Sequence, residues 1–137
     1  WKGLRIMGLG GCQRYNNEDT YQYTEAAMRR RARKLWLQAH KVGGIDILLT
    51  HAPASGLNDG TDRAHKGFVC FNGLLDEYQP AWFVHGHVHL NYDAKLPRVC
   101  TRGNTTVINA TERYVFEIPD PDPEIRNQPF WKKWFGV

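Results

Sequence analysis

The chain has 137 residues, of which 42% are hydrophobic and 23% charged, a composition typical of one folded domain of modest size. No apolar run approaches the length of a membrane-spanning helix, so we expect no membrane association. The formal net charge of +4 at pH 7 leaves an anionic partner open, nucleic acid included. Cys12, Cys70 and Cys100 are widely spaced and odd in number, which favours reduced thiols and a cytoplasmic location.

The first expected elements are a short strand and a long helix. The segment "LRIMGLGG" (4–11) predicts a strand that ends in a glycine turn. After a polar loop, Thr24 is the expected N-cap of a helix that reaches about Lys41 and stops at the glycine pair 43–44. The apolar side chains of this helix recur at helical spacing: Met28, Ala32, Leu35, Trp36 and Ala39.

A second strand and helix follow. In the segment "IDILL" (45–49), the apolar run of Ile45, Ile47, Leu48 and Leu49 is typical of a strand covered on both faces. The loop 54–64 is rich in turn formers, and we interpret its Asp59 and Asp62 as turn and helix-cap residues. The next apolar stripe predicts an amphipathic helix closed by Pro80, with Phe68, Phe71, Leu74, Leu75 and Tyr78 on its buried side.

The remaining chain is expected to be mostly strand. "AWFV" (81–84) predicts another buried strand, and "TTVINATERYVFEI" (105–118) predicts two strands of a hairpin. Strands that alternate with helices indicate an α/β fold. We therefore expect one domain over residues 1–118 and a proline-rich, then aromatic, tail over 119–137. The tail would carry an aromatic face, if helical, made of Phe130, Trp131, Trp134 and Phe135.

Three histidines, His85, His87 and His89, follow the strand "AWFV" at alternate positions. Imidazole is the commonest metal ligand in proteins. Residues two apart in a strand project to the same side, so His87 and His89 could address one small volume, with Gly86 allowing the backbone to bend. His51 ends a different strand, and parallel pairing would bring it to the same edge. Because no cysteine pairs accompany them, an open catalytic metal site fits better than a closed zinc finger.

The segments "LLTHAP" and "HGHVH" resemble the last two signature motifs of the calcineurin-like metallophosphoesterase superfamily, and residues 3–118 are similar to bacterial and phage members. The resemblance implies a four-layer α/β/β/α sandwich and hydrolysis of a phosphomonoester or phosphodiester by a water that two divalent metal ions (Mn, Fe or Zn) activate. It implies that His51 and His87 ligate one ion and His89 the other. His65 and His85 would lie on the substrate side, with a helix-start role for His65 and structural hydrogen bonding for His85 as alternatives.

The earlier motifs of that family, Asp-x-His, Gly-Asp-x-x-Asp and Gly-Asn-His, do not occur in their places. The pair Asp59 and Asp62 follows His51 instead of preceding it, and "RGN" (102–104) is not followed by histidine. We therefore expect the C-terminal half of such a domain, without a certain catalytic residue of its own and inactive alone. Its partners would be a missing N-terminal half, the phosphate-ester substrate, and a second copy in a homo-oligomer. The alternative is a catalytically incomplete metal-binding or interaction domain.

Overall fold

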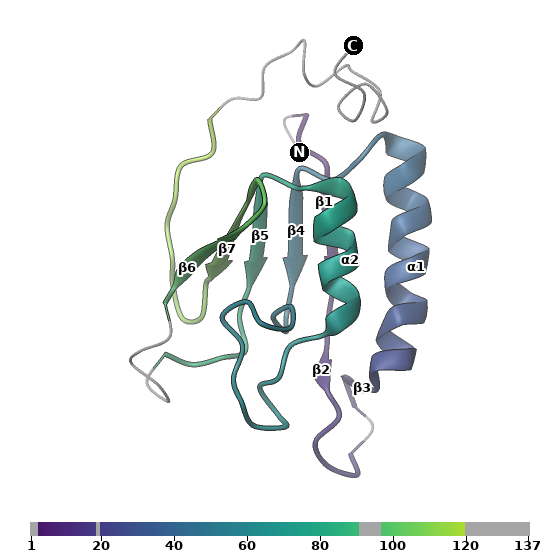
Figure 1. Ribbon diagram of the computed structural model, residues 1–137, viewed down its shortest axis with the longest axis vertical. Helices are drawn as coiled ribbons and strands as arrows, with labels where there is room; N and C mark the ends of the chain where they lie inside the picture. Colours follow the sequence, from purple (N-terminus) through teal and green to yellow (C-terminus); the bar gives the residue numbers. More distant parts are fainter. Residues whose placement is uncertain (1–2, 19, 91–96, 120–137) are drawn as a thin grey trace.

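A computed structural model describes residues 3–18, 20–90 and 97–119 (Figure 1). The elements in chain order are β1 (Ile6–Leu9), β2 (Cys12–Gln13), β3 (Gln22–Tyr23), α1 (Glu25–Val42), β4 (Ile47–Thr50), α2 (Val69–Tyr78), β5 (Trp82–His85), β6 (Val99–Arg102) and β7 (Thr105–Asn109). Apart from Pro119, the predicted aromatic tail at 119–137 lies outside the described residues.

The centre of the fold is a five-stranded sheet with the order β1-β4-β5-β7-β6. Strands β1, β4, β5 and β7 are parallel, and β6 pairs antiparallel to β7. The register places Leu48 of β4 beside Phe83 of β5. Because parallel strands end at the same edge, the residues after β4 and after β5 are brought together, as Figure 1 shows. The predicted α/β class is confirmed.

Both helices begin and end for identifiable reasons. The amide of Ala27 donates to Thr24 Oγ1 at 3.2 Å, and Gly43 closes α1 in the left-handed conformation with φ of 80°, so the predicted bounds of this helix are confirmed. Helix α2 has no side-chain cap of its own. The Glu25 carboxylate, from the first turn of α1, accepts the amides of Val69 at 3.1 Å and Cys70 at 2.7 Å. One helix therefore caps the other.

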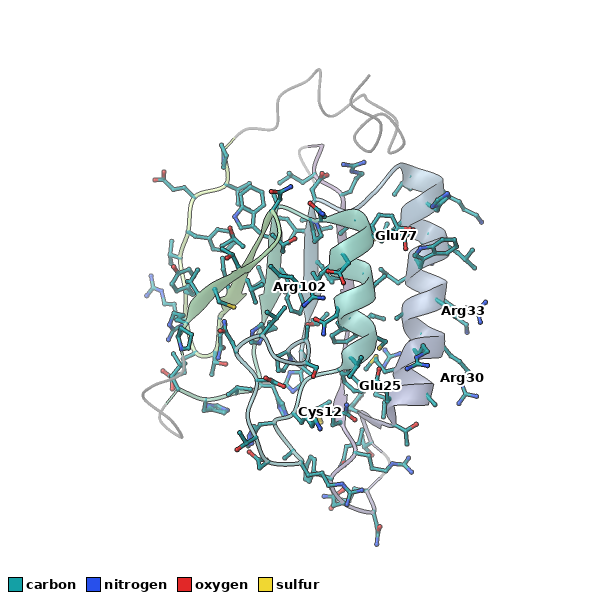
Figure 2. The ribbon with its side chains drawn as sticks, in the orientation of Figure 1. Cys12, Glu25, Arg30, Arg33, Glu77 and Arg102 are labelled. Carbon is teal, nitrogen blue, oxygen red and sulfur yellow. The ribbon has the colours of Figure 1, made fainter. Side chains whose placement is uncertain are left out.

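The two helices cover one face of the sheet (Figures 1 and 2). Between them, the Trp36 indole donates to Glu77 at 2.6 Å and the Tyr78 hydroxyl donates to the Trp36 carbonyl at 3.0 Å. Leu48 and Phe83 are fully buried beneath the helices. The buried core includes all the predicted apolar residues of α1 except Trp36, which is half-buried, and all those predicted for the second helix. The periodicity of both helices was thus a reliable guide to the core.

The opposite face of the sheet is partly open in the described residues. On this face Leu49 is 51% exposed, Ile6 46% and Val99 40%, whereas Ile47 is buried, so the prediction that 45–49 is covered on both faces is wrong at Leu49. The half-buried Trp82 lies on this face with the Phe116 ring centroid 6.2 Å away. Within the described ranges there is one helical layer on the five-stranded sheet, together with the small β2–β3 ribbon. The four-layer arrangement remains a prediction.

The hairpin lies earlier in the chain than predicted. Strand β7 pairs with β6, which precedes it, and residues 110–118 contain no strand. The turn between them is Gly103–Asn104, in which Gly103 has a φ of 55° that a side chain would strain. The sequence "RGNT" therefore marks the turn of the hairpin. The apolar residues after Ala110 are spaced like those of a strand but do not form one.

Candidate functional site

His51 and His87 meet at the carboxyl edge of the sheet. His51 directly follows β4, and its amide and carbonyl continue the sheet by pairing with the Leu9 carbonyl at 3.2 Å and the Gly86 amide at 3.1 Å. His87 lies two residues beyond the end of β5. His51 Nε2 and His87 Nδ1 are 3.0 Å apart, and the ring centroids are separated by 4.7 Å. The structure thus brings together two of the three predicted ligands from separate strands.

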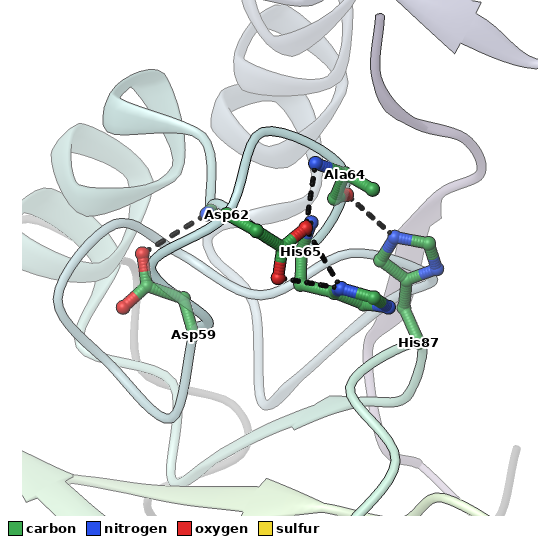
Figure 3. A network of polar contacts seen from close by, with 6 residues as sticks. Asp59, Asp62, Ala64, His65 and His87 are labelled. Atoms are coloured by element: carbon green, nitrogen blue, oxygen red, sulfur yellow. Dashed lines mark hydrogen bonds and ion pairs between the residues drawn. The ribbon is translucent and has the colours of Figure 1, made fainter. Parts of the chain in front are cut away.

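The contact made by His87 Nε2 determines which ring nitrogen of His87 carries the proton. His87 Nε2 lies 2.8 Å from the Ala64 carbonyl oxygen, which can only accept, so Nε2 carries the proton (Figure 3). In a neutral ring the lone pair is then on Nδ1, which accepts from His51 Nε2–H. Metal-binding histidines characteristically donate their second N–H to a backbone carbonyl or carboxylate in this way. Sequence reasoning missed Ala64 because a backbone acceptor leaves no signature in residue type.

The backbone at His87 is left-handed, with a φ of 68°. This conformation is costly for a residue with a side chain, and such outliers concentrate at functional sites. Gly86, which was expected to supply the bend, has room for a Cβ, whose nearest neighbour would be Thr111 Oγ1 at 3.8 Å. The prediction that Gly86 is the bending residue is therefore wrong, and the unusual conformation is that of His87.

His89 lies on the exposed surface and does not complete a three-ligand group. Its predicted convergence with His87 assumed strand alternation, whereas β5 ends at His85 and the left-handed His87 redirects the chain. Among the described residues, no three His, Cys, Asp or Glu side chains are grouped as a metal site requires. His51 and His87 fit a metal as a two-nitrogen donor pair, and the remaining ligands have to come from elsewhere.

Asp59 and Asp62 shape the loop behind His87. Asp59 accepts the Gly56 amide and the Gly67 amide, each at 3.0 Å. Asp62 accepts the amides of Ala64 at 2.9 Å and of His65 at 3.2 Å. The predicted turn role of both aspartates is confirmed. The predicted helix-cap role is wrong, because α2 begins at Val69 and takes its cap from Glu25.

His65 and His85, the two substrate-side candidates, occupy different environments. His65 Nδ1 lies 2.8 Å from an Asp62 carboxylate oxygen, and its ring centroid is 5.1 Å from that of His87 (Figure 3). It is in a turn well before α2, so a helix-start role is wrong. His85 is 1% exposed, and its Nδ1 is 3.1 Å from the Gly86 carbonyl, whereas Nε2 has no hydrogen-bond partner among the described residues. The structural interpretation of His85 fits this burial.

Burial keeps the site's imidazoles neutral. It lowers the pKa of His51. It also lowers the pKa of His87, a shift that the hydrogen bond to Ala64 opposes and the charges of His51, His65 and His89 reinforce. Burial lowers the pKa of His85 to about 4. The His65 hydrogen bond lowers the pKa of the Asp62 carboxyl group. Neutral imidazole is the form that binds metal, so His51 and His87 are ready to act as ligands near neutral pH.

A pocket of about 350 Å³ opens beside the pair. It is lined by His51 and by the loop between Gly11 and Gln22, including Tyr15 and Tyr21. This volume lies within the range of small-molecule sites. His51 therefore faces a space that could admit a ligand, and the site is not closed off by its own loops.

Comparisons with known proteins point in one direction. The chain is 34% identical over 71 residues to metallophosphoesterase domain-containing protein 1 from Homo sapiens and, equally, to that from Mus musculus. The match covers 50% of this chain and 20% of each relative, so it spans only a fifth of their length. No family model matches the chain. The similarity supports a relationship to metallophosphoesterase-domain proteins.

The fold also has a counterpart among solved structures. One crystal structure superposes with a TM-score of 0.56 at 20% identity, over 82% of this chain and 42% of the other. At that identity the likeness concerns the α/β fold alone. In the part of the chain that the structure describes, no helix is long and apolar enough to cross a membrane.

Proposed function

We propose that the chain belongs to a metal-dependent phosphoesterase, in which His51 and His87 ligate one divalent metal ion and His89 ligates a second. The observation that carries the proposal is the His51–His87 pair. The two imidazoles follow separate strands, and His51 Nε2 lies 3.0 Å from His87 Nδ1. The other ring nitrogen of His87, Nε2, donates to a backbone carbonyl, as in many metal-binding histidines. The similarity to metallophosphoesterase-domain proteins supports the same chemistry. We include His89 as a ligand because of the resemblance of "HGHVH" to the family motif, and not because of where its side chain lies.

Each imidazole has a defined task. His87 presents Nδ1 because its Nε2 proton is committed to the Ala64 carbonyl. His51 has to move its proton from Nε2 to Nδ1 so that Nε2 can also bind. A pair of divalent ions (Mn, Fe or Zn) held there would supply Lewis-acid polarisation of the phosphoryl group and a water of lowered pKa. Substrate enters through the pocket beside His51. The His65 ring lies 5.1 Å from that of His87, centroid to centroid, so His65 can contact a substrate held at His87.

We propose further that the remaining ligands, carboxylates above all, come from an N-terminal half of the domain. The open face of the sheet supports this, because Ile6, Leu49 and Val99 form an apolar surface that a second layer would bury. Without that half, the chain is expected to bind metal weakly, to hydrolyse negligibly, and to self-associate through the open face. Its three free cysteines suit the cytoplasm.

The test compares this chain with a polypeptide extended upstream, using bis(4-nitrophenyl) phosphate and Mn²⁺. We expect activity in the extended form only, and its loss in His87→Ala and His89→Ala. His40→Ala is the matched control, because His40 is an exposed histidine that stacks on Trp36 in the last turn of α1, at the end of the fold opposite the carboxyl edge of the sheet (Figure 1). Activity that survives His87→Ala would contradict the metal assignment.

The alternative function is a metal-binding or interaction domain with an incomplete site. Its supporting observation is that the described residues offer two converging imidazoles and no third ligand. Titration with Mn²⁺ separates the two functions. Metal binding that requires His51 and His87, without hydrolysis by the extended polypeptide, would favour the binding domain.

A further inference from the structure

A second pocket shares no lining residue with the one beside His51. Its volume is about 390 Å³ and its lining includes Gln13, Arg14, Thr24, Glu25, Arg63 and Lys66. Its walls come from the segment after β2, from the start of α1 and from the turn before α2. No catalytic or metal role assigned above uses this pocket.

The charge of this pocket is positive on its open side. Arg14, Arg63 and Lys66 contribute three cations against one carboxylate, that of Glu25. Glu25 is turned toward the start of α2, where it accepts the amides of Val69 and Cys70. It also accepts from the Gln13 side chain at 3.4 Å. The three basic residues of the lining outnumber this one carboxylate, so the net charge of the lining is positive and favours an anionic ligand.

The pocket is coupled to the imidazole pair through one short turn. The Lys66 amide donates to the Asp62 carbonyl at 3.0 Å, which closes the turn 62–66. Within it, Ala64 holds His87 through its carbonyl, while Arg63 and Lys66, on either side, line the basic pocket. The residue that holds His87 and the residues that line the basic pocket are therefore neighbours in one hydrogen-bonded turn.

We propose that this basic pocket binds a second phosphate group of the substrate, while the ester to be hydrolysed lies at His51 and His87. The substrate class is then a molecule with at least two phosphates. A polyphosphorylated small molecule and a nucleic-acid strand share this chemistry. Arginine binds phosphate oxygens in a planar fork and lysine binds them as a point charge, so the pocket offers both modes. This inference rests on the proposed phosphoesterase function.

The test of the pocket needs no hydrolysis. Binding of inorganic phosphate, tripolyphosphate and a short single-stranded oligothymidylate is measured by calorimetry in EDTA at low salt. We expect tripolyphosphate or the oligothymidylate to bind about tenfold more tightly than phosphate. Arg63→Gln and Lys66→Gln should each reduce that affinity about fivefold, the effect of one partly exposed ion pair. The control is Arg33→Gln, on the outer side of α1 in Figure 2, which should change nothing.

The result identifies the source of the second phosphate. Dependence on Arg63 and Lys66 with the oligothymidylate alone assigns it to a nucleic-acid strand, and with tripolyphosphate alone to a small molecule. Both results support the pocket. Equal affinity for all three ligands, no measurable binding, or an equal loss in Arg33→Gln would overturn it.

A kinetic measurement then connects the pocket to the site. In the extended polypeptide, Lys66→Gln should raise KM for a substrate with two phosphates and leave kcat unchanged, because it removes binding common to the ground and transition states. An unchanged KM would overturn the link to the substrate. If the extended polypeptide is inactive, the phosphoesterase proposal fails, and the binding experiment still decides whether the pocket takes polyphosphate.

Discussion

Between strand β5 and the loop that follows it, the chain passes from packed interior to strained sheet edge within five residues. Phe83 is fully buried, and its ring packs on that of Phe71 beneath the helices, with centroids 6.5 Å apart. Two residues on, His85 is also buried, but its Nε2 has no hydrogen-bond partner in the described part of the chain. Two residues further, His87 adopts a left-handed backbone. Stability is thus concentrated at the start of the strand, and conformations that cost free energy are concentrated at its end.

The contrast between the packed interior and the strained edge indicates which residues stabilise the fold and which cost free energy. Interior residues are close-packed, so substitutions there change the free energy of unfolding. Edge residues have unsatisfied or strained groups that persist because the surrounding sheet and loop hold them. We therefore expect substitutions in the interior to lower stability, and substitutions at the edge to weaken metal binding.

The largest effect is expected from Leu48→Ala in the interior. Leu48 is fully buried, so the cavity and lost burial should lower the free energy of unfolding by about 3 kcal/mol. Its neighbour Leu49 is the matched control, because it is the same residue type in the same strand but points to the open face. Leu49→Ala should cost less than about 1 kcal/mol. Urea unfolding measures both, and equal losses would mean that the second face is covered in solution.

His85 should make stability depend on pH. Its pKa is lowered to about 4 in the folded protein, against about 6.5 in the unfolded chain. As pH falls below the unfolded value, the unfolded chain takes up a proton that the folded one refuses, so stability is lost between these values and no further below about 4. From pH 7 to pH 5 the loss should be roughly 2 kcal/mol.

Urea unfolding in EDTA measures this pH dependence without interference from metal. His85→Phe keeps an aromatic ring against Phe83 and removes the titrating group. The pH dependence of this variant should be weaker by the contribution of one proton. A variant as pH-sensitive as the parent would show that other histidines are responsible.

The sequence was sufficient to predict features fixed by neighbouring residues. The ends of α1, at Thr24 and Gly43, were predictable because capping depends on a few adjacent positions. The meeting of His51 and His87 was also predictable, because two apolar strands in an α/β order end at one edge. Local pattern and topology together therefore identified the most important contact of the candidate site.

What the sequence could not predict depends on residues far apart in the chain. Whether Leu49 is covered depends on what packs against it, and an apolar run is the same for one covered face or two. The Ala64 carbonyl behind His87 and the Glu25 cap on α2 are contacts between distant segments. The left-handed conformation of His87 is imposed by its surroundings, whereas sequence rules assign such a position to the glycine beside it.

A smaller loss is expected at the junction of the two helices. Glu25→Ala removes the acceptor for the Val69 and Cys70 amides and should lower the free energy of unfolding by about 1–2 kcal/mol. Burial, together with the charge of Glu25, raises the pKa of Cys70 to about 12. The variant should therefore also alkylate faster at Cys70 with iodoacetamide. Glu117→Ala, on an exposed residue, is the control for both measurements.

The smallest change in stability, and the largest in binding, is expected from His87→Asn. Asparagine tolerates the left-handed backbone better than other residues with side chains, which offsets the loss of the contacts with His51 and Ala64. The free energy of unfolding should change by less than about 1 kcal/mol. Weak Mn²⁺ binding, which we expect the pair to provide, should disappear. Calorimetric titration measures Mn²⁺ binding, and urea unfolding measures stability. Leu48→Ala should show the reverse result: it should be less stable than the parent but should still bind Mn²⁺ under conditions in which it is folded. A His87→Asn variant as unstable as Leu48→Ala would show that the edge is structural, and unaltered Mn²⁺ binding would place the metal elsewhere.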